Sequence, residues 1–137
     1  MSSNAIWSLD VHHVAVEELD DLNSLVVGVA ENADGSGKSL LFSTTLTPFD
    51  EQDRLLGQDT YCISTEWGAT VYGGVMSCIL QDNVLVLTLD PEAADILELS
   101  KECFLNLHTE QDAILQLRQG LRRILSSSSI SPSHLLL

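Results

Sequence analysis

Apolar and polar residues alternate along much of the chain, in the two-residue period that indicates β-strands. The first such stretch runs from Ile6 to Glu17, and its apolar positions change sides after Val11. A shift of one residue moves every following side chain to the other face, so we expect a bulge or twist near His12 and His13. Further strand-like segments are 25–30, 40–46, 61–64, 70–80, 84–89 and 103–107.

Two of these segments, 25–30 and 84–89, are apolar on both faces and are therefore predicted to be interior strands. Turn signals separate the segments. Residues 32–37 contain two glycines, and Asp82-Asn83 predicts a two-residue hairpin turn, because both side chains tolerate positive φ.

Two helices are predicted after the strands. Asp90-Pro91-Glu92 combines a capping aspartate, a proline at the first helical position and an acid in the first turn. Residues 109–112, Thr-Glu-Gln-Asp, resemble a capping box and open a second, amphipathic helix. Its apolar stripe consists of Ile114, Leu117, Leu121 and Leu125.

The predicted fold class is α+β and mainly β. We expect one or more antiparallel sheets with about 6–8 strands in all, a short helix near 91–99 and a C-terminal amphipathic helix near 110–125. The sequence contains no internal repeat and no linker, so residues 1–125 are expected to form a single domain. Residues 126–137 are rich in serine and are expected to be a flexible tail.

Composition adds a strong charge imbalance to this picture. The chain has 45% hydrophobic and 19% charged residues, which is typical of a folded core. Asp and Glu number 20 and Lys and Arg only 6, which gives a formal net charge of -14. This charge repels nucleic acids and anionic membranes and accelerates encounter with basic proteins. We therefore expect neither a nucleic-acid nor a membrane partner.

The expected location is the cytoplasm. Residues 1–7 lack the features of a secretory signal, and no stretch approaches the ~20 apolar residues of a membrane span. The cysteines, Cys62, Cys78 and Cys103, are widely spaced and lie in apolar contexts, as is typical of reduced thiols.

Motifs of enzymes and metal sites are missing. An EF-hand loop that began at Asp50 would have Arg54 at the fifth position, where a ligand is needed, and Leu55 at the sixth, where a glycine is needed. The sequence contains no Cys-x-x-Cys pair that could bind zinc. There is no Gly-x-Ser-x-Gly elbow, and the cysteines lack nearby cations. His12-His13 is interpreted as a strand pair, and residues 72–75 (YGGV) as a kinked strand. We expect no enzymatic activity, no catalytic residue, no metal and no cofactor.

Several motifs occur in an order that resembles a known family. "FDEQDRLLGQDTYC" begins at residue 49, and "ATVYGGV", "NVLVLTLDPEAADIL" and "LRQGLRRIL" follow it. This order is similar to that of the immunity protein 10 family of bacterial polymorphic toxin systems. The resemblance covers more than half of the chain, while the first forty residues and the tail after Leu125 contribute nothing to it.

The resemblance implies a small, mainly β cytoplasmic antidote that binds and silences a toxin encoded beside it. The net charge suggests that this toxin domain is basic, and nucleases are the obvious basic class. The alternative is an acidic interaction or structural domain unrelated to toxins, for which a homo-oligomer is one form. A small hydrolase that uses some of the acids is a third hypothesis.

The expected partner-binding residues are acids, which would steer a basic partner, and exposed aromatic residues, which make strong contacts. They are Asp50, Glu51, Asp53, Asp59, Glu66, Trp67 and Tyr72. Phe49, Leu55 and Leu56 are expected to anchor the acidic segment to the core. For some positions of these motifs, the alternative to a role in recognition is a purely structural role. These are Gly57, Asp59, Tyr61, Gly73 and Gly74.

Overall fold

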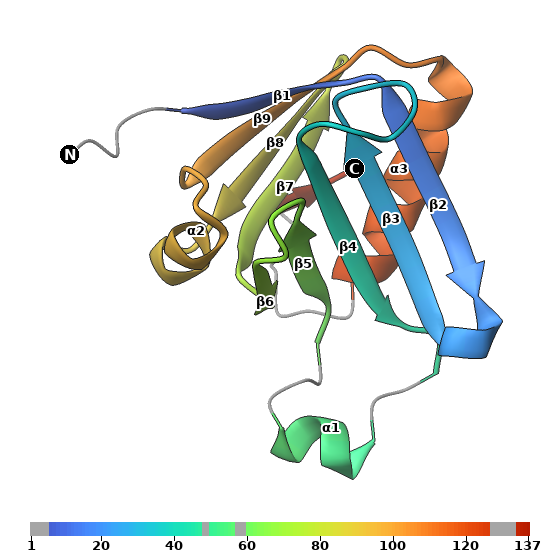
Figure 1. The fold of residues 1–137 in the computed structure, drawn as a ribbon, viewed down its shortest axis with the longest axis vertical. Coiled ribbons are helices and arrows are strands. Elements are labelled where there is room, and N and C mark those ends of the chain that lie inside the picture. The colour runs from blue at the N-terminus through green and yellow to red at the C-terminus, as the bar shows by residue number, and fades with distance from the viewer. Residues whose placement is uncertain (1–5, 48–49, 57–59, 127–133) are drawn as a thin grey trace.

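The computed structural model of the protein describes residues 6–47, 50–56, 60–126 and 134–137, apart from the side chains of residues 53 and 54. Two five-stranded sheets face each other (Figure 1). Sheet 1 has the order β1-β9-β8-β7-β10, and sheet 2 has the order β2-β3-β4-β5-β6.

Sheet 1 consists of β1 (Trp7–Val11), β9 (Glu102–Leu107), β8 (Val84–Leu89), β7 (Val75–Gln81) and β10 (Leu135–Leu136). Sheet 2 consists of β2 (His13–Leu19), β3 (Ser24–Ala30), β4 (Ser39–Thr45), β5 (Cys62–Thr65) and β6 (Thr70–Tyr72). The helices are η1 (Asp20–Leu22, a 3₁₀ turn), α1 (Glu51–Leu55), α2 (Pro91–Leu97) and α3 (Gln111–Leu125).

The predicted class, α+β and mainly β, is confirmed. Sheet 2 is antiparallel throughout, and so is the β7-β8-β9 meander. The two edge strands of sheet 1, however, pair in parallel: β1 with β9, and β10 with β7. Segments 25–30 and 84–89 became β3 and β8, which lie between neighbours on both sides, as their two-sided apolar pattern predicted.

The chain crosses from sheet 1 to sheet 2 at His12. β1 ends at Val11, β2 begins at His13, and the His12 N–H donates to the Ala30 carbonyl oxygen of sheet 2 at 3.0 Å. The change of apolar side after Val11 is therefore caused by a change of sheet, and not by a bulge within one strand. A bulge and a change of sheet each shift the side-chain alternation by one residue. In this fold the shift arises because the core lies on opposite sides of the two sheets.

The chain crosses back to sheet 1 at Gly73-Gly74, where the predicted kink separates β6 from β7. Both glycines have positive φ, 75° and 98°. The Gly73 N–H donates to the Tyr61 carbonyl at 2.9 Å, and the Gly74 carbonyl accepts from the Asp90 N–H at 2.9 Å. A Cβ at Gly74 would lie 2.6 Å from the Cβ of Ala93, so this crossing requires glycine for its conformation and for space.

The predicted start is confirmed for α2 but not for α3. Asp90 caps α2 by accepting from the Ala93 N–H at 2.8 Å, with Pro91 at the first helical position, as predicted. The prediction of a capping box at residues 109–112 is wrong. The N-cap of α3 is Glu110, without a side-chain cap, and Thr109 lies one residue too early, with its buried hydroxyl unpaired in the described structure.

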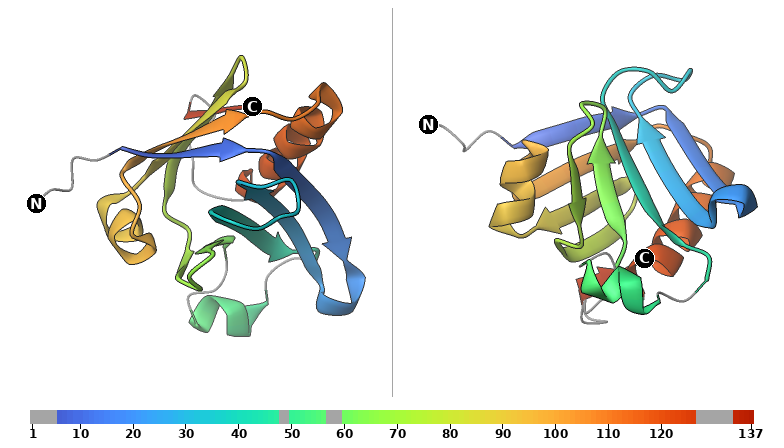
Figure 2. Two further views of the ribbon diagram at one scale, coloured as in Figure 1. Left: turned by 45° about the horizontal axis from the view of Figure 1, so that its top comes forward. Right: turned by 60° about the horizontal axis from the view of Figure 1, so that its bottom comes forward.

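α3 packs on β2 and β3 through the predicted apolar stripe, whose side chains are all buried. A Cβ at Gly120 of this helix would lie 2.7 Å from the Val27 side chain, so the helix approaches the sheet closely. Figure 2 shows α3 beside β2 and β3, and α2 at a different side of the sandwich, near β6. The inner faces of both sheets and these helices share one hydrophobic core.

The end of the chain forms a strand that the sequence pattern did not predict. β10 pairs with β7, Leu135 and Leu137 pack against the core, and the Leu137 carbonyl accepts from the Arg122 guanidinium. Residues 127–133 lie outside the described residues, so the flexible tail stays a prediction for them.

We expect Gly74→Ala to destabilise the protein more than Gly68→Ala. Both glycines have positive φ, which costs an alanine about 1–2 kcal/mol, but a Cβ at Gly68 meets nothing within 4 Å. The overlap with Ala93 should add about 1–3 kcal/mol at Gly74. Urea unfolding of both variants measures the difference, and equal losses would show that Ala93 moves aside freely.

Candidate functional site

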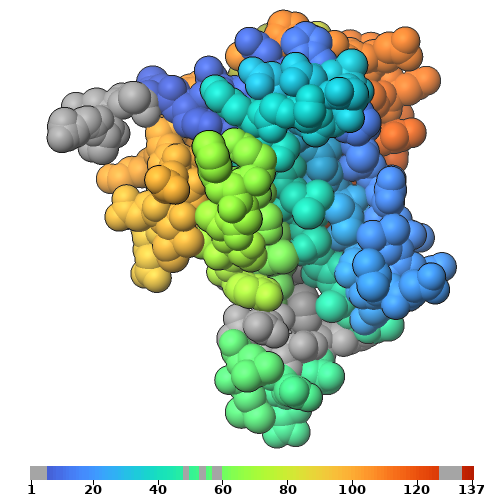
Figure 3. Space-filling view, viewed as in Figure 1, coloured from blue at the N-terminus to red at the C-terminus, as the bar shows by residue number. Residues whose placement is uncertain are grey.

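Those predicted partner-binding residues that the structure describes fall in three separate places. Asp50 and Glu51 are exposed at the start of α1. Asp53 lies within α1 with its side chain outside the described structure, and Asp59 lies outside the described residues altogether. Figure 3 shows α1 projecting from the body of the molecule, so Asp50 and Glu51 lie at one end of the molecule.

The expectation that Leu55 and Leu56 anchor this segment is wrong. Their exposed fractions are 80% and 60%. The five-residue helix α1 projects from the body of the molecule (Figure 1), so there is no core against which these leucines could pack. Phe49, the third expected anchor, lies outside the described residues. The acidic residues around Leu55-Leu56 were the one signal in the sequence that these leucines could be exposed, and the sequence analysis assigned them to the core instead.

The turn between β5 and β6 carries Glu66 and Trp67. The Glu66 carboxylate accepts from the Ser39 N–H at 2.9 Å, which ties the turn to the start of β4. Glu66 therefore has a structural role in addition to its charge. Trp67 is 76% exposed, and an exposed tryptophan next to an acid has the character of an interface hot spot.

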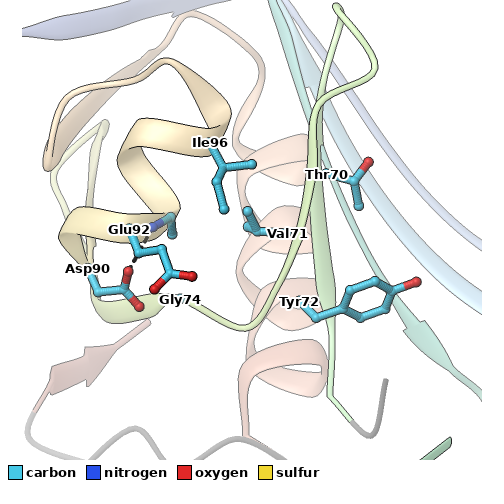
Figure 4. A pocket seen from close by; sticks show the side chains of 8 residues that line it. Thr70, Val71, Tyr72, Gly74, Asp90, Glu92 and Ile96 are labelled. Carbon is cyan, nitrogen blue, oxygen red and sulfur yellow. Dashed lines mark hydrogen bonds between the residues drawn. The ribbon is translucent and has the colours of Figure 1, made fainter. Parts of the chain in front are cut away.

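Tyr72 lies at the end of β6, beside a pocket of about 350 Å³ between β6 and α2 (Figure 4). The pocket is lined by Thr70, Val71, Tyr72, Gly74, Asp90, Glu92, Ala93 and Ile96. The side chains of Val71 and Ile96 face each other across it, whereas the ring of Tyr72 points to the other side of β6.

The register shows why the backbone of β6 lines this pocket. The N–H of Gly73 donates to the Tyr61 carbonyl, and the N–H of Thr65 donates to the Ala69 carbonyl. Odd-numbered residues of this stretch therefore bond to β5, and the N–H and C=O groups of Thr70 and Tyr72 point away from β5 toward α2. The pocket thus combines an open sheet edge with an apolar wall and two acids.

The pocket's acids come from the start of α2. Asp90 uses one carboxylate oxygen to cap the helix, and Glu92 is exposed. Neither acid belongs to the ion pairs found among the described residues, His108–Asp10 and Arg123–Glu18. This negative potential suits a cationic side chain of a partner. The sequence analysis missed these acids because it interpreted Asp90-Pro91-Glu92 only as a helix start.

Tyr61 has the structural role that was proposed as the alternative to recognition. Its side chain is 1% exposed, and its hydroxyl oxygen accepts from the Val75 N–H at 2.9 Å. Burial raises the pKa of Tyr61 to about 12. Gly73 and Gly74 form the crossing described above, so they are structural as well. Gly57 and Asp59 lie outside the described residues.

Two of the three thiols do not have the environment of nucleophiles. Cys78 and Cys103 are buried, and burial raises the pKa of their thiols to about 12 and about 11. A protonated, inaccessible thiol reacts poorly. Cys62 is half-buried, with its Sγ 2.8 Å from the Ser43 hydroxyl.

A cluster of polar residues lies where β1 and β9 end. The rings of His12 and His108 stack with centroids 5.0 Å apart. The Asp10 carboxylate accepts from His108 and Asn106, and the hydrogen bond from His108 contributes most to lowering the pKa of Asp10. Within the described ranges, no three His, Cys, Asp or Glu residues lie close enough together to hold a metal ion. No described helix is long and apolar enough to cross a membrane.

We expect Tyr61→Phe to lower the free energy of unfolding by about 1–3 kcal/mol, because the buried Val75 N–H loses its acceptor. The folded-state pKa of Tyr61 lies above its ordinary value of 10.0, so its contribution is present below pH 10 and is lost as pH rises toward 12. The variant should lack this alkaline component and keep the one that comes from Cys78 and Cys103. Urea titrations at several pH values measure both effects.

Tyr72→Phe is the matched control, since Tyr72 is 49% exposed and its ring points away from the core. It should change stability by about 0.5 kcal/mol or less. Similar losses in the two variants would contradict a special role for the Tyr61 hydroxyl.

Comparison with known proteins adds a family. No curated protein and no solved structure matches the chain. A family model described as immunity protein 10 matches residues 10–115. The matched region contains most of both sheets, both crossings between them and all of α2. It also contains each of the predicted partner-binding residues. Because the match covers well over half of the sequence, this chain belongs to the immunity protein 10 family.

Proposed function

We propose that this immunity protein neutralises its cognate polymorphic toxin domain by binding it directly, and that the toxin domain is basic, such as a nuclease. Family membership implies an immunity protein with a toxin protein as its partner, and this observation carries the proposal. The basic character of the toxin is inferred from the formal net charge of -14.

The mode of action is binding without a chemical step by the immunity protein itself. It acts in the cytoplasm of the bacterium, and it requires no metal or cofactor. An antidote of this kind needs a rigid, strongly charged surface more than a catalytic site, because complementary charge accelerates encounter and disfavours wrong partners.

The toxin-contacting surface comprises α1, the β5–β6 turn and the region around β6. These elements present the acids Asp50 and Glu51, the exposed Trp67, and Tyr72 next to the acidic pocket. Asp53, Asp59 and Glu66 belong to the same proposal. The acids increase the rate of association, and the exposed aromatic and leucine side chains supply apolar contact once the toxin has docked.

Co-expression tests the proposed function. Bacteria that produce the toxin domain encoded next to this gene should survive only when this chain is produced as well. The purified chain should also bind a catalytically inactivated form of that toxin domain. The matched control is an immunity protein of another family at the same expression level. Growth arrest despite soluble, folded chain would contradict the proposal.

We expect the double variant Asp50→Asn/Glu51→Gln to bind the toxin more slowly, with little change in the dissociation rate. Charges at the edge of an interface act mainly on encounter. The effect should shrink above ~0.15 M salt, where the screening length is about 8 Å. Stopped-flow binding at low and high salt measures both rates.

The control for this variant removes the same charge from another place. Glu110 and Asp112 are exposed at the start of α3, and Glu110→Gln/Asp112→Asn is matched in charge and chemistry. Slower association in the α1 variant alone would support an interface near α1. Equal slowing in both would mean that only net charge matters, and an unchanged rate in both would contradict steering.

A further inference from the structure

The outer face of sheet 1 carries a row of apolar residues that do not belong to the described hydrophobic core. In this sheet Leu9, Leu85 and Leu87 point to the core, so the residues between them point outward. Phe104 pairs with Val86, Val86 with Ile79, and Ile79 with Leu136. These side chains therefore lie next to one another across β9, β8, β7 and β10, and we call them the apolar row.

Within the described part of the chain, the apolar row is partly accessible. Phe104, Val86 and Ile79 are half-buried, and Leu136 is 51% exposed. None of them belongs to the hydrophobic core or packs against it. The helices lie elsewhere, because α2 contacts β6 and α3 contacts strands of sheet 2.

The corresponding row of sheet 2 is different in character. It consists of Ala15, Gly28, Leu41, Ser64 and Thr70, which the register places side by side on the outer face. These residues are mostly small or hydroxylated, as is usual for a sheet face in water. A contiguous apolar row rimmed by polar residues is typical of a protein-binding surface.

The charge around the apolar row points to its occupant. On the two flanking rows of the outer face, the acids among the described residues are Asp10 and Glu102. Asp10 is already engaged by His108 and Asn106. The described acids proposed to meet the toxin lie at α1, in the β5–β6 turn and at α2, and not on this face. A basic toxin is drawn to those acids, whereas a like-charged copy approaches best where acids are few.

We propose that the outer face of sheet 1 binds a second copy of this chain, in a two-fold symmetric dimer that packs one apolar row against the other. A two-fold axis brings the same patch of both subunits together, so an uncharged apolar centre is self-complementary. The face of a single sheet is small beside the 20–30 residues per side of standard interfaces, so the dimer is a weak one. Each subunit keeps α1 and the β6–α2 pocket free, so the dimer presents two toxin-binding surfaces.

Sedimentation velocity of the full chain over a range of concentrations tests the dimer. We expect a concentration-dependent shift from monomer to dimer that becomes stronger as salt rises, because salt screens the repulsion between two copies of net charge -14. Val86→Lys, at the centre of the apolar row, should raise the dimer dissociation constant by about tenfold or more. A single monomeric species at all concentrations and at high salt would overturn the proposal.

Controls separate folding from assembly. Leu41→Lys places the same charge on the outer face of sheet 2, where Leu41 is 43% exposed, and should leave the dimer unchanged. If Val86→Lys fails to fold, the double variant Phe104→Thr/Ile79→Thr removes apolar surface with residues that favour strands, and it should weaken the dimer likewise. Equal weakening by Leu41→Lys would overturn the assignment of the face.

Toxin binding by the same variants distinguishes the occupants. Val86→Lys should bind the inactivated toxin domain at the parent's rate, because the apolar row lies away from the proposed toxin surface. Loss of toxin binding with an unchanged monomer–dimer equilibrium would show that the toxin occupies this face and would overturn the proposal. A dimer in a protein that fails to protect cells would overturn the proposed function alone.

Discussion

The hydrogen bond from the Val75 N–H to the Tyr61 hydroxyl holds the chain where it passes from sheet 2 to sheet 1. At this crossing the backbone leaves one set of strand pairs and has not fully entered the next, yet it is buried. A buried N–H without an acceptor is costly, and Tyr61, the residue just before β5, supplies the acceptor. The rest of sheet 1 depends on this placement, because β8 and β10 pair with β7, β9 pairs with β8, and β1 pairs with β9.

The same crossing builds the acidic pocket. The Gly74 carbonyl accepts from Asp90, Asp90 caps α2, and Ala93 of that helix packs where any side chain at Gly74 would lie. Residues that carry the resemblance to the immunity protein 10 family thus shape the fold, and they hold the pocket's acids against β6 as a consequence. Trp67, Leu55 and Leu56 are exposed side chains outside this framework. Under our two proposals, toxin binding through the acidic surfaces weakens as salt rises and dimerisation through the apolar row strengthens, because salt screens both the attraction to a basic toxin and the repulsion between copies.

Short-range chemistry was enough to determine much of the secondary structure from the sequence. Asp82 adopts positive φ in the predicted hairpin turn, with φ 57°. Asp90 and Pro91 start α2 where the cap pattern placed it, although the helix ends at Leu97 rather than Leu99. The stripe that begins at Ile114 is buried. Each of these features depends on residues within a few positions of one another, so the information is local.

Tertiary structure alone decided how the strands divide into two sheets and which surfaces remain open. A shift in alternation at His12 is the same in a bulge and in a change of sheet, and only the pairing of β1 with the distant β9 distinguishes them. Leu55 and Leu56 have the apolar character of core residues, but burial depends on whether the helix meets a core, and α1 does not. β10 is too short to show a period, and its strand exists because β7 offers an open edge. The apolar row has the same origin: Phe104 and Leu136 lie far apart in sequence, and long-range register makes them part of one surface.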